Sequence, residues 1–317
     1  MPFARTVLGD IEPAELGVID AHEHIIIAGG RPGEMSADFI LADADKAVEE
    51  LSRAKAQGLG TVVDAMPCGL GRDAEALADV SRRSGVHVIA PTGIHTPAWY
   101  VDIHWSNRLG ADQLAPLMMA DVTEGIDRLD YTGPIVERTG IRAGVIKIGG
   151  TADFPTDRDA AVFEAAAIAQ RETGVPILTH ADGGVRGVEQ ARFLADHGAD
   201  LSHVLLSHVD KVVDREYHRE LAATGARVEL DQGFRWQDGP NGTLQVLEWL
   251  AEDGLTDHVT LGLDAARQGY WEVYGGGPGI TWFVDGLSAL LAERGIGDDV
   301  QQLFYVDNPR AAYTFIE

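Results

Sequence analysis

Cysteine and lysine are both scarce in this sequence of 317 residues. Cys68 is the single cysteine, so the chain cannot form an intramolecular disulfide, and we expect a reducing, cytoplasmic setting. Lysine occurs only at positions 46, 55, 147 and 211, and the other 21 of the 25 basic residues are arginine. Because lysine is rare, a lysine inside an apolar segment is unusually informative.

Long apolar runs and basic charge are lacking as well. No apolar stretch approaches the roughly 18 residues of a membrane-spanning helix, and the first 17 residues lack the apolar core of a signal peptide. The 50 acidic residues outnumber the 25 basic ones, which gives a formal net charge of −25. Such a charge repels nucleic acid and anionic membranes, so we expect a small-molecule substrate and neither of those partners.

A short β-branched segment, a loop and an alanine-rich helical segment recur along the chain. This alternation is typical of a parallel sheet with crossover helices. Eight strand candidates are apolar on both faces, as strands between a core and a helix layer are: residues 18–21, 60–65, 86–92, 144–149, 176–179, 203–207, 227–231 and 258–263. We therefore predict a single-domain (β/α)₈ TIM barrel, which needs about 250 residues. An open doubly wound sheet is the alternative.

Helix boundaries support the same pattern. Helices are predicted over residues 43–57, 157–173, 187–197 and 243–252, each with a glycine within two residues of its end.

Three segments depart from the alternation of strands and helices. Residues 1–17 form a hairpin-like lead-in, while 94–143 and 265–280 are predicted as long loops over the C-terminal face, where barrel enzymes place their active sites. His95 and His104 in the first loop are candidates to reach the site.

The strongest local signal is the segment Asp20-Ala21-His22-Glu23-His24, at the end of the first predicted strand. Side chains two positions apart on a strand share a face, so His22 and His24 point the same way. Two imidazoles placed like this can bind one cation. A chance pair of histidines on a strand is the alternative.

Four further polar residues lie in or directly after apolar strand candidates. Lys147 lies within the fourth, and His180, His208 and Asp264 follow the fifth, sixth and eighth. Burying such groups is costly unless they are paired or bind a metal. Each of them alone could be a satisfied core residue, but their convergence at one barrel mouth indicates a metal centre.

Lys147 needs a separate explanation, because an ammonium group repels a cation. Burial and nearby positive charge lower the pKa of a lysine amine. The neutral amine can add CO₂ to give a carbamate, an anionic ligand with two oxygens that can bridge two metals. The alternative is a lysine paired with a buried carboxylate.

This order of residues resembles the phosphotriesterase family of the amidohydrolase superfamily. The segments Thr6–Ile11 and Asp307–Arg310 are also similar to that family, so the resemblance covers nearly the whole chain. It implies a binuclear centre of two divalent ions, usually zinc, with a hydroxide between them. The implied ligands are His22, His24 and Asp264 on the buried metal, His180 and His208 on the outer metal, and carboxylated Lys147 as the bridge.

The implied chemistry is hydrolysis. Two cations about 3.5–4 Å apart acidify a bridging water and polarise the substrate oxygen. Asp264 is the predicted catalytic residue, because it is placed to take up the proton of the attacking hydroxide. A barrel that only binds a ligand would be expected to lack one or more of the six positions, and all six are present.

The substrate is predicted from the segment after the eighth strand. Arg267 and Tyr270 match a branch of the family that hydrolyses phosphorylated furanose lactones and holds the phosphate with these residue types. That branch also has a lysine after the seventh strand, whereas this chain has Gly233-Phe234-Arg235-Trp236-Gln237-Asp238. Arg235 is the candidate replacement, and Trp236 is predicted to line the pocket.

We therefore expect a lactonase that opens a sugar-derived lactone, with or without a phosphate. The alternatives are a phosphotriesterase or carboxylesterase that uses the same metals, and an amidohydrolase that cleaves an N-acyl compound. Because many barrel hydrolases form pairs, a homodimer is also expected.

Overall fold

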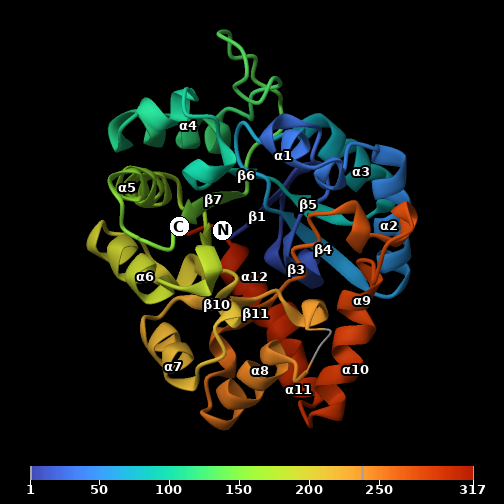
Figure 1. Cartoon of the computed structure of the whole chain (residues 1–317). Helices are drawn as coiled ribbons and strands as arrows, with labels where there is room; N and C mark the ends of the chain where they lie inside the picture. Colours follow the sequence, from blue (N-terminus) through green and yellow to red (C-terminus); the bar gives the residue numbers. More distant parts are fainter. Residues whose placement is uncertain (1, 237–238, 317) are drawn as a thin grey trace.

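The parallel strands of the computed structural model form a barrel of two hydrogen-bonded sheets (Figure 1). The structure describes residues 2–236 and 239–316. One sheet has three strands in the order β3-β4-β5, and the other has six in the order β11-β10-β9-β8-β7-β6. Their bounds are β3 (Val18–Glu23), β4 (Leu59–Asp64), β5 (His87–Ile89), β6 (Pro91–Thr92), β7 (Val145–Gly150), β8 (Ile177–Ala181), β9 (Val204–Leu206), β10 (Arg227–Leu230) and β11 (Val259–Leu261).

The two sheets meet at two junctions, one closed by a main-chain hydrogen bond and the other by the chain itself. The N–H of Asp264, just past β11, donates to the carbonyl oxygen of His22 in β3 at 2.8 Å. The other junction lies at Ala90, which divides the predicted strand 86–92 into β5 and β6. β5 pairs with β4 and β6 pairs with β7. The prediction of a (β/α)₈ barrel is therefore confirmed.

Helices surround the strands on the outside (Figure 1). They are α1 (Gly30–Met35), α2 (Ala44–Ala56), α3 (Ala74–Ser84), α4 (Ala111–Thr123), α5 (Asp157–Thr173), α6 (Gly187–Asp196), α7 (Arg215–Ala223), α8 (Gly242–Glu252), α9 (Thr281–Val284), α10 (Gly286–Glu293), α11 (Asp298–Gln302) and α12 (Asn308–Tyr313). The predicted cap of α2 is present, because the Asp43 side chain accepts the N–H groups of Asp45 and Lys46. Over residues 2–236 and 239–316, no helix has the length and apolar composition of a membrane span.

Two of the three irregular segments contain regular structure. Within residues 1–17, β1 (Ala4–Thr6) and β2 (Gly9–Ile11) pair as an antiparallel hairpin. The segment 94–143, predicted as a loop, contains α4, which packs against α5. The loop prediction is therefore wrong over α4. Proline inside a helix is unfavourable, and α4 contains Pro116. Buried side chains of α4, such as Leu114, Met118 and Val122, stabilise the helix by packing against the rest of the protein.

The segment 265–280 is a loop with two short 3₁₀ turns, Gln268–Tyr270 and Glu272–Tyr274. Its position depends on Glu50 of α2, which is only 1% exposed. The Glu50 carboxylate accepts the N–H groups of Val273 at 3.1 Å and Ile280 at 3.0 Å. A buried carboxylate satisfied in this way holds the loop against the barrel.

Strand periodicity determines the layers inside the barrel. Val145 of β7 and Leu178 of β8 belong to one buried apolar cluster. Lys147 and His180 follow them by two residues on the same strands, so they lie on the same face and nearer the C-terminal ends. An apolar layer therefore lies below the polar side chains of the barrel mouth.

Gly93 directly follows β6 and allows the chain there to lie against β7. A Cβ atom at Gly93 would meet the carbonyl oxygen of Lys147, whereas a Cβ at Gly58 would have no neighbour within 4 Å. Both glycines have φ +112°, so alanine is strained at both positions. We expect Gly93→Ala to lower the free energy of unfolding by about 1–3 kcal/mol more than Gly58→Ala, because only Gly93→Ala adds a steric clash. Urea denaturation of both variants measures this difference, and equal losses would contradict it.

Candidate metal centre

The six predicted metal ligands lie at the C-terminal ends of the barrel strands. His22 is in β3 and His24 directly follows it, Lys147 is in β7, His180 is in β8, His208 lies two residues after β9 and Asp264 lies three residues after β11. This is the end of a barrel at which enzymes of this fold carry their active sites.

Two of these residues have a backbone conformation that non-glycine residues rarely adopt. His208 has φ 67° and Asp264 has φ 52°, both in the left-handed region. The structure holds Asp264 there with the hydrogen bond from its N–H to His22, and it holds His208 with the N–H of Lys211, which donates to the His208 carbonyl at 3.1 Å. Strained residues of this kind often occur at functional sites.

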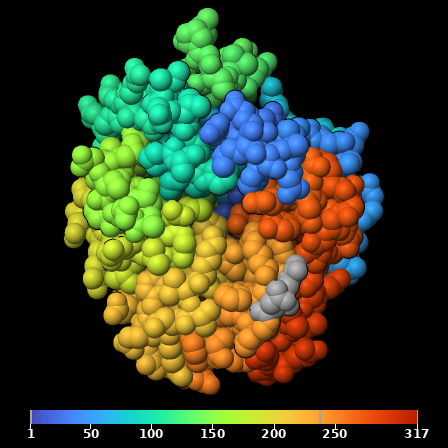
Figure 2. All heavy atoms as spheres, in the orientation of Figure 1, coloured from blue at the N-terminus to red at the C-terminus, as the bar shows by residue number. Residues whose placement is uncertain are grey.

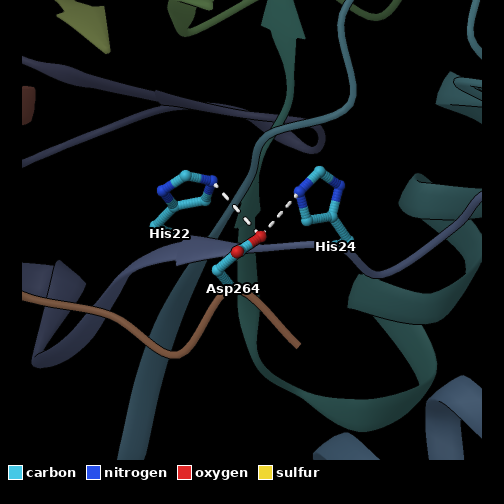
Figure 3. Close-up of side chains that lie close together, drawn as sticks. All are labelled: His22, His24 and Asp264. Carbon is cyan, nitrogen blue, oxygen red and sulfur yellow. Dashed lines mark ion pairs between the residues drawn. The ribbon is translucent and has the colours of Figure 1, made fainter. Parts of the chain in front are cut away.

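His22, His24 and Asp264 face one another closely (Figure 3). The Oδ1 atom of Asp264 lies 3.2 Å from His24 Nε2 and 3.8 Å from His22 Nε2. One ligand atom from each of the three lies within 4.8 Å of the others. Two imidazoles and a carboxylate are donors that zinc and similar divalent ions take, so these residues fit a metal ion.

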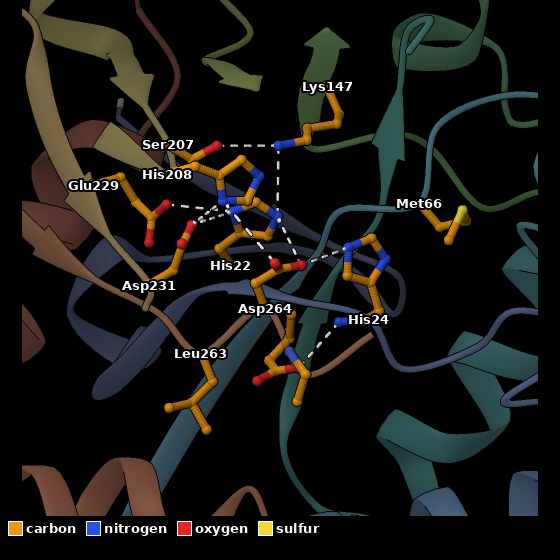
Figure 4. A network of polar contacts seen from close by, with 12 residues as sticks. His22, His24, Met66, Lys147, Ser207, His208, Glu229, Asp231, Leu263 and Asp264 are labelled. Carbon is orange, nitrogen blue, oxygen red and sulfur yellow. Dashed lines mark hydrogen bonds and ion pairs between the residues drawn. The ribbon is translucent and has the colours of Figure 1, made fainter. Parts of the chain in front are cut away.

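The other three predicted ligands line the same cavity, and Figure 4 shows two of them, Lys147 and His208, beside His22. Lys147 Nζ lies 3.5 Å from His22 Nε2, and it donates to the Thr179 carbonyl at 2.9 Å. The ring centroids of His180 and His208 are 4.4 Å apart, and those of His22 and His208 are 4.9 Å apart. Burial lowers the pKa of Lys147 to about 8, so its neutral amine is accessible near neutral pH.

Buried carboxylates contact the Nδ1 atoms of two histidines. His22 Nδ1 lies 3.3 Å from Glu229 Oε2 and 3.2 Å from Asp231 Oδ2. His208 Nδ1 lies 2.7 Å from Asp231 Oδ2. A carboxylate on Nδ1 fixes the ring and leaves Nε2 for a metal. Glu229 and Asp231 were not predicted from the sequence, although the alternation of Glu229 in β10, and of Asp231 directly after it, with Val228 and Leu230 was a signal for them.

Burial also favours the uncharged form of three of these imidazoles, those of His22, His180 and His208. It lowers the pKa of His22 to about 3, with Lys147 adding to the effect. It lowers the pKa values of His180 and His208 as well. A neutral imidazole is the form that binds a metal, so the electrostatics agree with the geometry.

The centre opens into a cavity of about 250 Å³. Figure 2 shows the surface hollowed near the middle of this face, between segments from both halves of the chain. All six predicted ligands line the cavity. The other lining side chains include Arg267 and Tyr270 from the 265–280 loop, Lys211, His95, Trp99 and Arg235.

Comparison with known proteins identifies the family. A model of the Phosphotriesterase family matches residues 2–313. The chain belongs to this family. It is 32% identical to a phospho-furanose lactonase of Mycoplasmopsis synoviae, over 99% of this chain and 92% of that protein. It is 28% identical to an aryldialkylphosphatase of Saccharolobus solfataricus, over 96% of this chain and 97% of that protein. The crystal structure of a lactonase from Listeria monocytogenes superposes with a TM-score of 0.89 at 26% identity, over 99% of this chain and 100% of that one.

Membership of the Phosphotriesterase family confirms two of the sequence predictions. The resemblance was correct, and the predicted hydrolase class agrees with relatives that act on lactone and phosphoester bonds. The family is metal-dependent with a binuclear centre, and this member has His and Asp groups that could bind metal.

Arg235 lines the cavity, but its guanidinium also donates hydrogen bonds to other atoms of the protein. Its Nη1 donates to the carbonyls of Asp231 at 2.7 Å and Leu263 at 3.1 Å. Its Nη2 donates to the Asp264 carbonyl and to Asp264 Oδ2, the latter at 3.1 Å. Burial by itself would raise the pKa of Asp264. The charge of Arg235 and the nearby histidines outweigh this effect, so the pKa is lowered and Asp264 is ionised. Most of the donors of Arg235 are therefore committed to Asp264 and its neighbours, which argues against the predicted role in substrate binding.

Trp236 is not among the residues that line the cavity. Its indole N–H donates to Thr243 Oγ1 at 3.1 Å, and its ring packs against Gly242 at the start of α8. The structure therefore does not bring Trp236 into the cavity, because the chain turns this ring toward α8. Gln237 and Asp238 of the same segment lie outside the described residues.

Two further side chains line the cavity: Lys211, which was not predicted at the site, and His95, which was one of two candidate histidines. Lys211 lines the cavity and is exposed, and its place three residues after His208 was the available signal. His95 lines the cavity, whereas His104 does not and instead bonds Ser106 Oγ at 2.8 Å through Nδ1.

Proposed function

We propose that this protein is a metal-dependent lactonase that opens a sugar-derived lactone bearing an anionic group such as a phosphate. The observation that carries the proposal is one cavity that is lined both by the six predicted metal ligands and by Arg267, Tyr270 and Lys211. In a chain with a net charge of −25, two cationic side chains beside a tyrosine at one cavity favour an anion there. The relative named phospho-furanose lactonase supports the same substrate class.

Arg267 is available for such a contact. Its side chain is 45% exposed, and its nearest carboxylate, Asp38 Oδ2, lies 3.8 Å from Nη1, beyond a strong hydrogen bond. The guanidinium carbon lies 4.5 Å from the centroid of the Phe39 ring, which supports its plane at the cavity mouth. A planar fork held like this can bind two oxygens of a phosphate.

The proposed cofactors are two zinc ions. His22, His24 and Asp264 would hold one, His180 and His208 would hold the other, and carboxylated Lys147 would bridge them. When bound, the ions acidify a water and polarise the carbonyl oxygen of the substrate.

Asp264 is the proposed proton acceptor. Its carboxylate is ionised and points into the cavity beside His24, and Arg235 holds it in place. It takes one proton from the attacking water as the water oxygen bonds to the carbonyl carbon. The ring C–O bond then breaks with its electron pair left on the ring oxygen, and Asp264 gives its proton to that alkoxide, which yields a hydroxy acid. The leaving group stays tethered, so the site needs no acid strong enough to expel an amine.

Phosphotriester hydrolysis is the second candidate function. The same centre suits attack on a phosphoryl group, and the Saccharolobus solfataricus relative is named an aryldialkylphosphatase. Hydrolysis of a carboxylic ester or of an N-acyl compound stays a further prediction. The cytoplasmic setting also stays a prediction; Cys68, on which it rests, is buried in the core.

Turnover of one 1,4-lactone with and without a 5-phosphate tests the proposed function. Proton release gives kcat/KM for both substrates in the metal-loaded protein. We expect at least a tenfold preference for the phosphorylated lactone, equal to about 1.4 kcal/mol. Arg267→Ala should abolish the preference and leave turnover of the plain lactone unchanged.

Other outcomes redirect the proposal. Equal turnover of both lactones by the wild type would contradict an anion site on the cavity wall. No turnover of either lactone would contradict the lactonase function and favour the phosphotriester, which paraoxon then tests directly.

The carboxylated lysine has its own test. We expect ¹³C NMR of the metal-loaded protein in ¹³C-bicarbonate to show one carbamate signal, because burial makes the Lys147 amine available to CO₂. Lys147→Met should lose the signal and bind less metal, measured by elemental analysis, whereas Lys55→Met should change neither. A signal that survives in Lys147→Met would contradict the assignment.

A homodimer is proposed through the arm formed by residues 127–138, at the top of Figure 1. Leu129, Ile135 and Val136 are 50%, 73% and 49% exposed there. Residues 127–138 hold three acidic residues and two arginines, so this surface is close to neutral in a strongly acidic chain, and a second copy can approach it.

Sedimentation velocity tests this interface. We expect a dimer for the wild type and a monomer for Ile135→Asp, while Val185→Asp, at an apolar site that is 36% exposed elsewhere on the surface, stays a dimer. A monomeric wild type, or a dimeric Ile135→Asp, would contradict the interface.

A further inference from the structure

His95 is the histidine of the cavity wall that the proposed metal set does not use. It lies just past β6, is 9% exposed and lines the cavity. Its ring centroid lies 4.5 Å from that of His180. It therefore lies beside the candidate metal centre, in the cavity that would hold the substrate.

A hydrogen bond determines which nitrogen of His95 carries the proton. The main-chain N–H of Thr96 donates to His95 Nδ1 at 2.7 Å, so Nδ1 is an acceptor. In the neutral ring the proton is then on Nε2. His95 therefore offers an N–H donor at Nε2 and no lone pair there, which distinguishes it from the histidines that would ligate a metal through this atom.

The position of His95 is rigid. Its main-chain N–H donates to Tyr100 Oη at 3.0 Å, and Tyr100 Oη in turn donates to the Cys68 carbonyl at 2.9 Å. The preceding carbonyl, of Ile94, accepts the N–H of Gly149 on β7 at 3.1 Å. A Cβ at Gly149 would lie 2.6 Å from the Thr96 nitrogen, so the two backbones are in direct contact.

The ring of His95 is also held from the side. Trp99 packs edge-on against it, with a centroid distance of 5.5 Å and an interplanar angle of 62°. Within residues 2–236 and 239–316, Nε2 of His95 has no hydrogen-bond partner. This atom is not one of the unpaired polar atoms that are fully buried, so it is accessible. The donor is therefore fixed in place and open to the cavity, as a preorganised contact to developing charge should be.

We propose that His95 is a substrate-binding residue whose Nε2–H donates a hydrogen bond to the ring oxygen of the lactone, the atom that leaves as the alkoxide. This inference rests on the proposed function. The metal ions, when bound, act on the water and the carbonyl oxygen, so the ring oxygen is the reacting atom that still needs a donor. Arg267 and Tyr270 belong to the loop that would hold the distal anion.

Three variants test the inference. His95→Phe keeps an aromatic ring against Trp99 but removes the donor, and we expect kcat and kcat/KM for the lactone to fall by the same factor, about 10²-fold. His95→Gln restores an N–H at a similar distance from the backbone and should recover at least part of the loss. The matched control is His104→Phe, a change to a histidine of the same segment outside the cavity, which should turn over the lactone like the wild type.

Two further measurements separate a substrate contact from other roles. The metal content of His95→Phe should equal that of the wild type, and a loss of metal would overturn the inference, because His95 would then be a ligand. A thiolactone of the same ring size has a leaving sulfur that accepts hydrogen bonds weakly. We expect His95→Phe to slow it much less than the lactone, and an equal loss would overturn the assignment to the ring oxygen.

Lactone turnover by the metal-loaded wild type shows whether the proposed function fails or only the role of His95 fails. Failure of the metal-loaded wild type to turn over any lactone contradicts the lactonase function and removes the basis of this inference. Turnover by the wild type that His95→Phe retains, or a His95→Gln variant as slow as His95→Phe, overturns the role of His95 alone.

Discussion

The carboxylate of Asp264 is the charge around which the mouth of the barrel is organised. It faces the Nε2 atoms of His24 and His22 on one side and the guanidinium of Arg235 on the other. Its own N–H binds the His22 carbonyl and closes the junction between β11 and β3. Because Asp264 is a predicted ligand and also part of the barrel closure, the catalytic centre and the fold are stabilised by the same contacts.

A second layer of buried carboxylates supports this arrangement. Glu23, fully buried between His22 and His24, accepts the N–H of His24 at 3.0 Å and the N–H of Ala265 at 3.1 Å through one oxygen. It therefore connects the chain after β3 to the chain after Asp264. Glu229 and Asp231 contact the imidazoles from below. Burying so many acids is unfavourable unless positive charge and donors face them, and bound cations would supply that charge.

The path of the chain after each strand decides what a polar residue there does. Arg235 and Arg267 both follow barrel strands and both line the cavity. Arg235 folds back so that its donors bind Asp264 and two carbonyls, whereas Arg267 lies over Phe39 and stays half-exposed. The same residue type therefore stabilises the centre in one case and is available to a substrate in the other.

Periodicity and residue order by themselves predicted the barrel and the strand positions to within a few residues, because the alternation of faces inside regular strands is a local property of the chain. The six side chains at its mouth were predicted from their order along the chain together with the resemblance to the phosphotriesterase family. Only the tertiary structure decided the roles of Arg235, Trp236, Lys211 and His95, and the contacts of Glu229 and Asp231. The direction of a side chain beyond a strand end depends on turns such as those at His208 and Asp264, and long-range contacts hold those turns.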